Sequence, residues 1–296
     1  MKKVNVLIST YNGEKYIKEQ IESIQRQSYQ NIAIYVRDDG STDGTISILK
    51  EYEKKGEITL LKGENLGFGG SFLTLLKESE DGDYWAFCDQ DDVWLEDKIA
   101  WAVEWLDKQD EKTPCMFHSA YYLTDEELNI ESSYLPPKER YTFRKAITEV
   151  LHMGFASVIN QALRNEMLKG EISHITSHDH WAELIVMKYG KVEFDSREAA
   201  YHRRLTYSLS GSSMKARIRW LKGALKGKSE ILPVAKEFDR VFGQGKKEKD
   251  YKIIRWFCNE RYNLRKSICK CFYPHRWRSS LSSEAVLRFL MLIGRV

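Results

Sequence analysis

The chain of 296 residues has no long hydrophobic run. A membrane-spanning helix needs roughly 20 consecutive apolar residues. The last apolar run, "AVLRFLMLIG" at 285–294, is much shorter and contains Arg288. The opening "MKKVNVLIST" has too short an apolar segment for a secretory signal. We therefore expect no membrane span and no signal peptide, and a cytoplasmic protein that is at most peripheral on the inner face of the membrane.

Cysteine is also scarce, with five residues, an odd number. Cys88 and Cys115 lie in apolar, strand-like runs and are expected in the core. Cys258, Cys269 and Cys271 lack metal-ligand spacing to a nearby His. The sequence therefore predicts neither a disulfide framework nor a zinc site, and it favours reduced thiols.

Acidic residues are few in the last part of the chain. Residues 213–296 carry 21 Lys and Arg against 7 Asp and Glu, a net charge of +14. Residues 1–212 carry 25 basic against 36 acidic residues, a net charge of −11. Two parts of opposite charge indicate two roles. The second part has helical periodicity almost throughout, and the boundary is expected in the loop-like stretch "LTYSLSGSS" at 205–213.

What the first part does have is regular alternation of strands and helices. Apolar strands are predicted near 4–9, 32–39, 58–63, 84–89 and 114–123, and helical segments lie between them near 12–28, 41–56, 69–79 and 93–109. This pattern predicts an α/β fold with a mostly parallel sheet flanked by helices. Ligands bind such sheets at the carboxyl ends of the strands. The unusual residues "STYNG", "RDDGSTDGT", "ENLGFGG" and "DQDD" all follow strands.

The most acidic of these turns is "DQDD", which places Asp89, Asp91 and Asp92 in four positions. Carboxylates this close repel one another unless a cation lies among them. Hard oxygen ligands of this kind suit Mg²⁺ or Mn²⁺ with a phosphate-bearing substrate. The alternative is an Asp-rich turn that caps the following helix, and this is the role expected for Asp92.

A second acidic pair, Asp38 and Asp39, ends the second strand. A carboxylate there could accept a hydrogen bond from a nucleobase N–H or a ribose hydroxyl. The alternative is a polar turn with Gly40 at positive φ and Asp43 as a helix cap.

Taken together and in this order, the segments "LISTYNGEKYIKEQIESIQRQSY", "YVRDDGSTDGT", "ENLGFGGSF" and "FCDQDDVW" resemble the nucleotide-sugar half of family 2 glycosyltransferases, which have the GT-A fold. The resemblance extends over about residues 4–211 and is specific in its first half. It implies a Rossmann-like mixed sheet flanked by helices, and the helical end falls outside it. The expected organisation is a catalytic domain at 1–212, with a nucleotide-sugar half at 1–122 and an acceptor half at 123–212, followed by a basic all-helical domain at 213–296.

The resemblance also implies roles for individual residues. The nucleotide sugar would contact Thr10, Tyr11, Asn12, Asp38, Asp39, Asn65, Asp89 and Gln90, with the loop at 67–70 nearby. Asp91 would bind the metal directly and Asp89 would hold the ribose or share the metal. Relatives often have an Arg after the Asn-x-Gly, and "GFGGSF" has none.

Enzymes that this sequence resembles invert the anomeric centre in one displacement, so a carboxylate must accept the proton of the acceptor hydroxyl. The segment "SHDHWAEL" resembles the family's "H-D-x-W" and makes Asp179 the expected base, with a helix N-cap as its alternative. His178 and His180 lie two apart, do not share a helix face and are expected to contact the acceptor or support the site.

Family members often complete the metal site with a late His in a "Y-R-x-H" context. Here "YHRRLTYSLSG" has His202 earlier than that pattern and Arg204 where the His is expected. Either His202 binds the metal, or Arg203 and Arg204 stabilise the departing diphosphate, whose charge grows in the transition state.

The resulting expectation is an inverting, Mn²⁺- or Mg²⁺-dependent glycosyltransferase that moves a hexose, with UDP-glucose as the favoured type of donor, to a glycan, lipid-linked or glycoprotein acceptor. The alternatives are a dTDP-rhamnose-dependent rhamnosyltransferase of surface polysaccharide synthesis, an inactive sugar-nucleotide or glycan binding module, and a nucleotidyltransferase. Residues 213–296 would form a helical cap, or contact the acceptor, a membrane surface or another subunit. Nucleic acid is not expected, because the first part is acidic.

Overall fold

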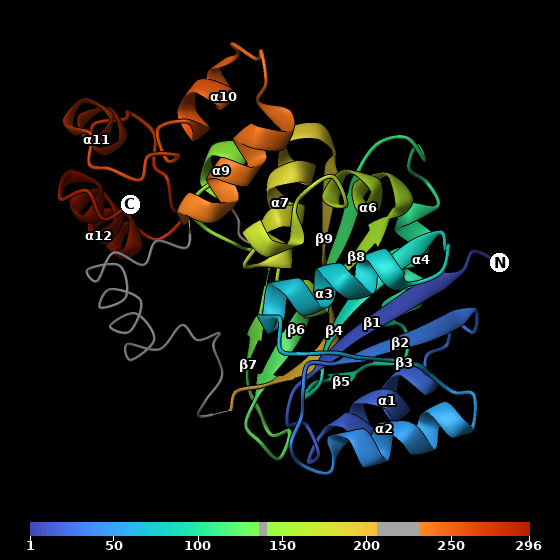
Figure 1. Cartoon of the computed structure of the whole chain (residues 1–296). Coiled ribbons are helices and arrows are strands. Elements are labelled where there is room, and N and C mark those ends of the chain that lie inside the picture. The colour runs from blue at the N-terminus through green and yellow to red at the C-terminus, as the bar shows by residue number, and fades with distance from the viewer. Residues whose placement is uncertain (136–140, 206–230) are drawn as a thin grey trace.

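The computed structural model describes residues 1–135, 141–205 and 231–296, and one mixed sheet organises them (Figure 1). Its strand order is β3-β2-β1-β4-β8-β6-β9-β5, and β7 pairs with β6. The strands are β1 (Val4–Thr10), β2 (Ile32–Asp38), β3 (Thr59–Lys62), β4 (Tyr84–Asp89), β5 (Val93–Trp94), β6 (Cys115–Thr124), β7 (Ile130–Tyr134), β8 (Ser157–Asn160) and β9 (Lys191–Arg203). The first four in sheet order, β3, β2, β1 and β4, are parallel, which brings the carboxyl ends of β1, β2 and β4 to one edge.

Helices cover both faces of the sheet because its parallel strands are apolar on both sides. Side chains of α1 (Ile17–Gln25), α2 (Thr45–Lys54) and α4 (Lys98–Leu106) pack against Val6 and Ile8 of β1. Side chains of α3 (Gly67–Glu78), α6 (Gln161–Met167) and α7 (His178–Tyr189) pack on the opposite face, against Leu7. A four-residue helix α5 (Phe143–Ala146) precedes β8. The predicted alternation of strands and helices is confirmed.

The remaining helices lie beyond α7. They are α9 (Ile231–Phe242), α10 (Lys249–Ile254), α11 (Leu264–Cys271) and α12 (Leu281–Leu292), and Figure 1 shows α11 and α12 together at one end of the molecule. Phe238, Tyr251 and Trp277 belong to the same buried cluster as Leu7 and Trp181. The prediction of helices after residue 230 is therefore confirmed, although residues 255–263, between α10 and α11, are not helical. These helices share a core with the sheet. The predicted boundary near 212 and the basic residues Arg217 to Lys228 lie outside the described residues.

Two local predictions were wrong. The expected loop at 67–70 is the first turn of α3, and Gly67 at its start has φ +71°. The expected helix at Val93 is instead the short strand β5, which pairs with β9, and α4 begins only at Lys98. Asp92 therefore precedes a strand and caps no helix. None of the helices in the described residues is long and apolar enough to cross a membrane.

Candidate active site

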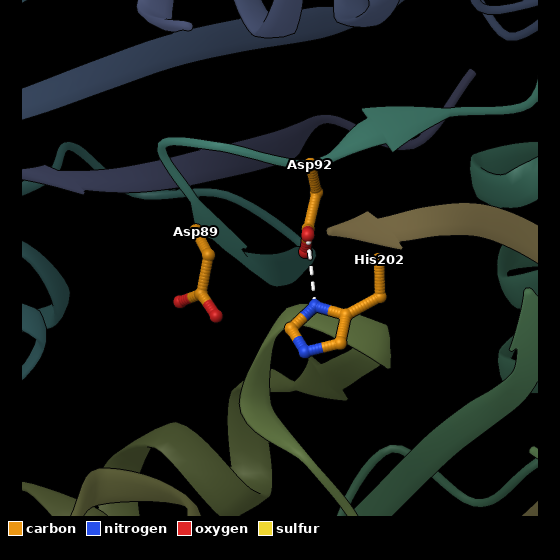
Figure 2. A group of neighbouring side chains, drawn as sticks. All are labelled: Asp89, Asp92 and His202. Atoms are coloured by element: carbon orange, nitrogen blue, oxygen red, sulfur yellow. Dashed lines mark hydrogen bonds and ion pairs between the residues drawn. The ribbon is translucent and has the colours of Figure 1, made fainter. Parts of the chain in front are cut away.

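Asp89, Asp92 and His202 form a cluster at the carboxyl end of β4 (Figure 2). Each side chain offers a ligand atom, and the three atoms lie within 4.8 Å of one another. Asp89 ends β4, and Asp92 lies in the turn before β5. His202 comes from β9, which the antiparallel pairing with β5 brings alongside. The His202 Nδ1 lies 2.8 Å from the Asp92 Oδ1.

The electrostatics of the cluster are those of a crowded acidic site. Burial, followed by the charges of Asp92 and Asp91, raises the pKa of Asp89 well above its usual range. Burial and the charge of Asp92 raise the pKa of Asp91 to about 6. Burial alone would lower the pKa of His202, but the charge and hydrogen bond of Asp92 prevail and raise it to about 9. The negative charge of the three carboxylates thus exceeds the positive charge of the single imidazole. A cation would relieve the repulsion between the carboxylates.

The donor set fits a divalent metal ion. The Asp92 Oδ2 is buried without a hydrogen-bond partner among the described residues, which leaves a carboxylate oxygen for an ion. Two carboxylates and an imidazole are suitable ligands for Mn²⁺. The Asp91 side chain is not part of this cluster, and its backbone carbonyl accepts a hydrogen bond of 2.8 Å from Arg203 Nη1. The direct role of Asp91 at the metal therefore stays a prediction.

The two arginines after His202 are held by acidic partners. Arg203 is buried, pairs with Glu19 and donates from Nε to the carbonyl of Glu126 at 3.0 Å. Arg204 lies 3.3 Å from a carboxylate oxygen of Glu131. In this arrangement Arg203 ties β9 to α1 and to the turn before β7, and its hydrogen bond to the Asp91 carbonyl also holds the turn after β4.

Two hydrogen bonds join the residues that directly follow β1 and β4, Tyr11 and Gln90. The backbone N–H of Tyr11 donates to the Gln90 Oε1 at 2.9 Å, and the Gln90 Nε2 donates to the Tyr11 carbonyl at 3.2 Å. Asn12 has φ 50° and accepts from the backbone N–H of Thr42 at 2.8 Å. The Tyr11 ring is exposed. Next to Asn12 a cavity of about 500 Å³ is lined by Asn12, Glu14, Lys15, Tyr16, Asp43 and Glu126.

Asp38 and Asp39 are buried and have several partners within the protein. Asp38 accepts from the Thr10 hydroxyl at 3.1 Å and from the backbone N–H groups of Gly40 and Ser41 at 3.1 and 2.9 Å. Gly40 has φ +91°, as the polar-turn alternative requires. Asp38 therefore shapes the turn, and contact of either carboxylate with a nucleotide stays a prediction.

Asp39 joins the end of β2 to the start of α3, and its ion-pair partner, Arg37, was not predicted from the sequence. It forms a buried ion pair with Arg37 and accepts from the backbone N–H groups of Leu66 and Gly67, both at 3.0 Å. Asn65 also accepts from Gly67 N–H, at 3.0 Å. The signal for Arg37 was a single charged residue inside the apolar strand "IAIYVRDD" directly before two acids.

Asp179 lies in the first turn of α7 and is almost fully buried. The N-cap of this helix is Ser177, whose hydroxyl donates to the Asp179 Oδ1, so the N-cap alternative for Asp179 was wrong. The backbone N–H of His180 donates to the same Oδ1 at 2.8 Å. The charge of Asp179 contributes to the raised pKa of Asp89, so the two carboxylates interact electrostatically.

The neighbouring histidines pack inside the protein. The His178 ring centroid lies 4.1 Å from that of Phe72 and 4.8 Å from that of Phe68, and burial lowers the pKa of His178 to about 4. The His180 Nε2 lies 2.7 Å from the carbonyl oxygen of Ala146. Neither belongs to the acidic cluster. His178 seats α7 against α3, and so places Asp179.

Comparisons with known proteins identify the family of the chain. The sequence model described as glycosyl transferase family 2 matches residues 5–170. The dTDP-rhamnosyl transferase RfbG of Shigella flexneri is 41% identical over 105 residues, which are 33% of this chain and 36% of that protein. The putative teichuronic acid biosynthesis glycosyltransferase TuaG of Bacillus subtilis is 27% identical over 218 residues, 72% of this chain and 83% of that protein. The matches with the first three curated relatives span only 36% to 43% of their length.

Solved structures match over nearly the whole chain. TarS 1–349 of S. aureus has a TM-score of 0.61 at 18% identity, covering 99% of this chain and 81% of that one. The mannosyltransferase PcManGT of Pyrobaculum calidifontis, solved with GDP-Man and Mn²⁺, has a TM-score of 0.52 at 16% identity, covering 99% and 87%. At these identities the likeness concerns the fold alone, which is the predicted GT-A fold with added C-terminal helices. Because the family model matches more than half of its residues, the chain belongs to glycosyl transferase family 2.

Proposed function

We propose that the protein is an inverting, metal-dependent glycosyltransferase that moves a sugar from a nucleoside diphosphate to a glycan acceptor. The observation that carries the proposal is the cluster of Asp89, Asp92 and His202 at the carboxyl end of β4. The carboxylate of Asp179, at the start of α7, is near enough for its charge to contribute to the raised pKa of Asp89. Metal ligands and a separate carboxylate base are the two groups that such a displacement requires. Membership of family 2 supports the same activity.

The residues have distinct parts in this mechanism. Asp89, Asp92 and His202 would hold Mn²⁺ or Mg²⁺, with Asp91 as an added ligand, and the ion would neutralise the diphosphate. The hydrogen bond between Asp92 and His202 fixes the imidazole ring for that role. Asp179 accepts the proton of the acceptor hydroxyl, while Ser177 and the His180 N–H fix its orientation. The exposed Tyr11 ring and the linked Gln90 would line the nucleotide site.

The donor that we favour is a UDP-hexose, and dTDP-rhamnose is the main alternative. TarS has been solved with UDP-GlcNAc, whereas RfbG is named a dTDP-rhamnosyl transferase. TuaG is assigned to teichuronic acid biosynthesis, which supports a cell-surface glycan as acceptor. Each of these properties belongs to the relative, and the donor of this chain is tested below.

The first experiment is a thermal shift of the purified protein with UDP, dTDP, GDP and their sugars, with and without Mn²⁺. A ligand that binds only the folded protein raises its melting temperature. We expect metal-dependent stabilisation by one nucleotide family, and release of free nucleoside diphosphate when the matching sugar donor turns over. Pyrophosphate release would instead indicate a nucleotidyltransferase.

Variants then assign the roles. We expect Asp92→Asn to abolish the Mn²⁺-dependent shift, and Asp179→Asn to lower turnover by at least about a hundredfold with the donor shift unchanged. Glu51→Gln, an exposed acidic residue of α2, is the matched control and should change neither. Nucleotide binding without transfer or hydrolysis of any donor would favour a binding module. Full turnover by Asp179→Asn would mean that another group is the base.

A further inference from the structure

The helices α11 and α12 carry an unusual amount of exposed apolar surface. Among the described residues, eight of the fifteen exposed large apolar side chains lie between Tyr262 and Ile293. The main ones are Leu264, Ile268 and Phe272 at α11 and Leu281, Phe289 and Leu292 on α12, with exposed fractions between 40% and 73%. Patches of this kind on a soluble fold mark a binding surface.

In both helices these side chains recur at helical spacing. Leu264, Ile268 and Phe272 are four residues apart, and Leu281, Phe289 and Leu292 are separated by eight and three. Residues at such spacings share one face of a helix. The other faces are buried, through Ser267 and Cys271 in α11 and through Leu287, Leu290 and Met291 in α12. Each helix therefore packs by one face and exposes an apolar stripe on the other.

The two helices form one structural unit. The Arg288 Nη1 donates to the Cys271 carbonyl at 2.6 Å, and the Tyr262 hydroxyl donates to the Leu292 carbonyl at 3.1 Å. Figure 1 shows them side by side at one end of the molecule, beyond α9 and α10. We call their exposed apolar stripes, with the basic residues around them, the outer face.

The surroundings of the outer face are strongly basic. Residues 261–296 contain eight Lys and Arg and one acidic residue, Glu284, which is buried. Arg261, Arg265 and Arg295 are exposed, and none forms an ion pair with an acidic side chain in the described parts of the chain. This concentration of positive charge favours an anionic partner, and the apolar stripes favour a partner with an apolar interior.

We propose that the outer face of α11 and α12 docks on an anionic phospholipid bilayer. Apolar stripes that enter the headgroup boundary, with arginines that pair with lipid phosphates, are the features of helices that lie in a membrane interface. A second copy of the chain is a poorer partner, since its outer face would bring the same positive charge. A helix of 12 residues is about 18 Å long, too short to span a bilayer, so the contact is peripheral. This docking would be independent of the chemistry at β4.

The test is flotation of the full chain with vesicles of phosphatidylcholine alone and of phosphatidylcholine mixed with phosphatidylglycerol. We expect binding to the mixed vesicles only, weakened by salt. Replacing Phe272, Leu281 and Phe289 with Ser should lower the partition coefficient at least about tenfold. Arg261→Ser and Arg265→Ser should each lower it about fivefold. Ile130→Ser and Lys50→Ser, exposed apolar and basic residues elsewhere, are matched controls that should bind like the parent chain.

Three results would overturn the proposal. The first is absence of binding to the mixed vesicles, and the second is unchanged binding by the triple Ser variant. The third is a dimer in light scattering that Phe289→Ser dissolves, which would make the outer face a contact between copies. A far-UV spectrum and nucleotide-dependent thermal shift like those of the parent chain would show that each variant is folded.

Discussion

Lys98 at the start of α4 is wholly buried although it carries an ammonium group. Its Nζ has no hydrogen-bond partner among the described residues and lies 4.8 Å from the centre of the Trp94 ring. Burial lowers the pKa of Lys98 to about 8, and the nearby Cys88 and Asp92 offset only part of that effect. A buried charge of this kind reduces stability wherever it remains protonated.

We expect Lys98→Met to stabilise the protein at pH 7 by on the order of 2 kcal/mol. The pKa is lower in the folded than in the unfolded chain, so between about pH 8 and 10.5 the unfolded chain binds more protons, and this lysine makes stability rise with pH. The variant should lose that rise, so its advantage over the parent chain should shrink across this range. Urea unfolding from pH 7 to 10.5 measures the difference. A difference in the free energy of unfolding that stays constant from pH 7 to 10.5 would contradict this prediction.

At the scale of single residues, the sequence indicated which residues carry the chemistry better than it indicated which residues contact one another. Asp89 and Asp91 follow a strand of five apolar residues, so their place at the sheet edge could be predicted. The contact between Asp92 and His202 could not, because it joins positions 110 residues apart through β5, a strand of two residues with no periodic signal. Arg37 was missed for a different reason: its partner Asp39 is only two residues away, but a lone charged residue in an apolar strand does not show that it forms a buried ion pair.

Among the elements, α3 and α7 approach so closely that one residue between them can have no side chain. A Cβ placed on Gly69 would lie 2.5 Å from the carbonyl carbon of Thr176 and 2.8 Å from the nitrogen of Ser177. Those are backbone atoms next to the N-cap of the helix that carries Asp179. The glycines of "GFGG" suggested a loop, since glycine is a poor helix former. They lie in a helix instead, because a side chain at Gly69 would not fit between α3 and the start of α7.

We expect Gly69→Ala to destabilise the protein by about 1–3 kcal/mol, although Ala for Gly inside a helix usually adds up to about 1 kcal/mol. The clash should push the start of α7 away from α3 and move Asp179, so turnover should fall more than nucleotide binding. Lys77→Ala, in the last turn of the same helix, should change neither. A variant as stable and active as the parent chain would show that the two helices can separate at no cost.

At the scale of the whole molecule, charge and packing divide the chain differently. The charge asymmetry suggested a separate basic domain, yet α9 packs into the main core. The Phe238 ring centroid lies 5.3 Å from that of Phe143 and 6.2 Å from that of Trp181, both of which belong to the part with the sheet. Periodicity predicts that a helix buries a face, but it does not say against which element, so this shared core could not be inferred from the sequence.

We expect Phe238→Ala to cost about 3–5 kcal/mol, as for large aromatic residues in a core. Because Phe238 contacts both α7 and α10, unfolding should remain a single transition at a lower denaturant concentration, followed equally by circular dichroism and Trp fluorescence. Nucleotide-dependent stabilisation should be retained in the fraction that is folded, since Phe238 is outside the site. Phe272→Ala, an exposed phenyl ring of the outer face, should leave the midpoint within about 0.5 kcal/mol. Two separate transitions would instead mean that α9 to α12 fold as an independent unit, as the charge pattern suggested.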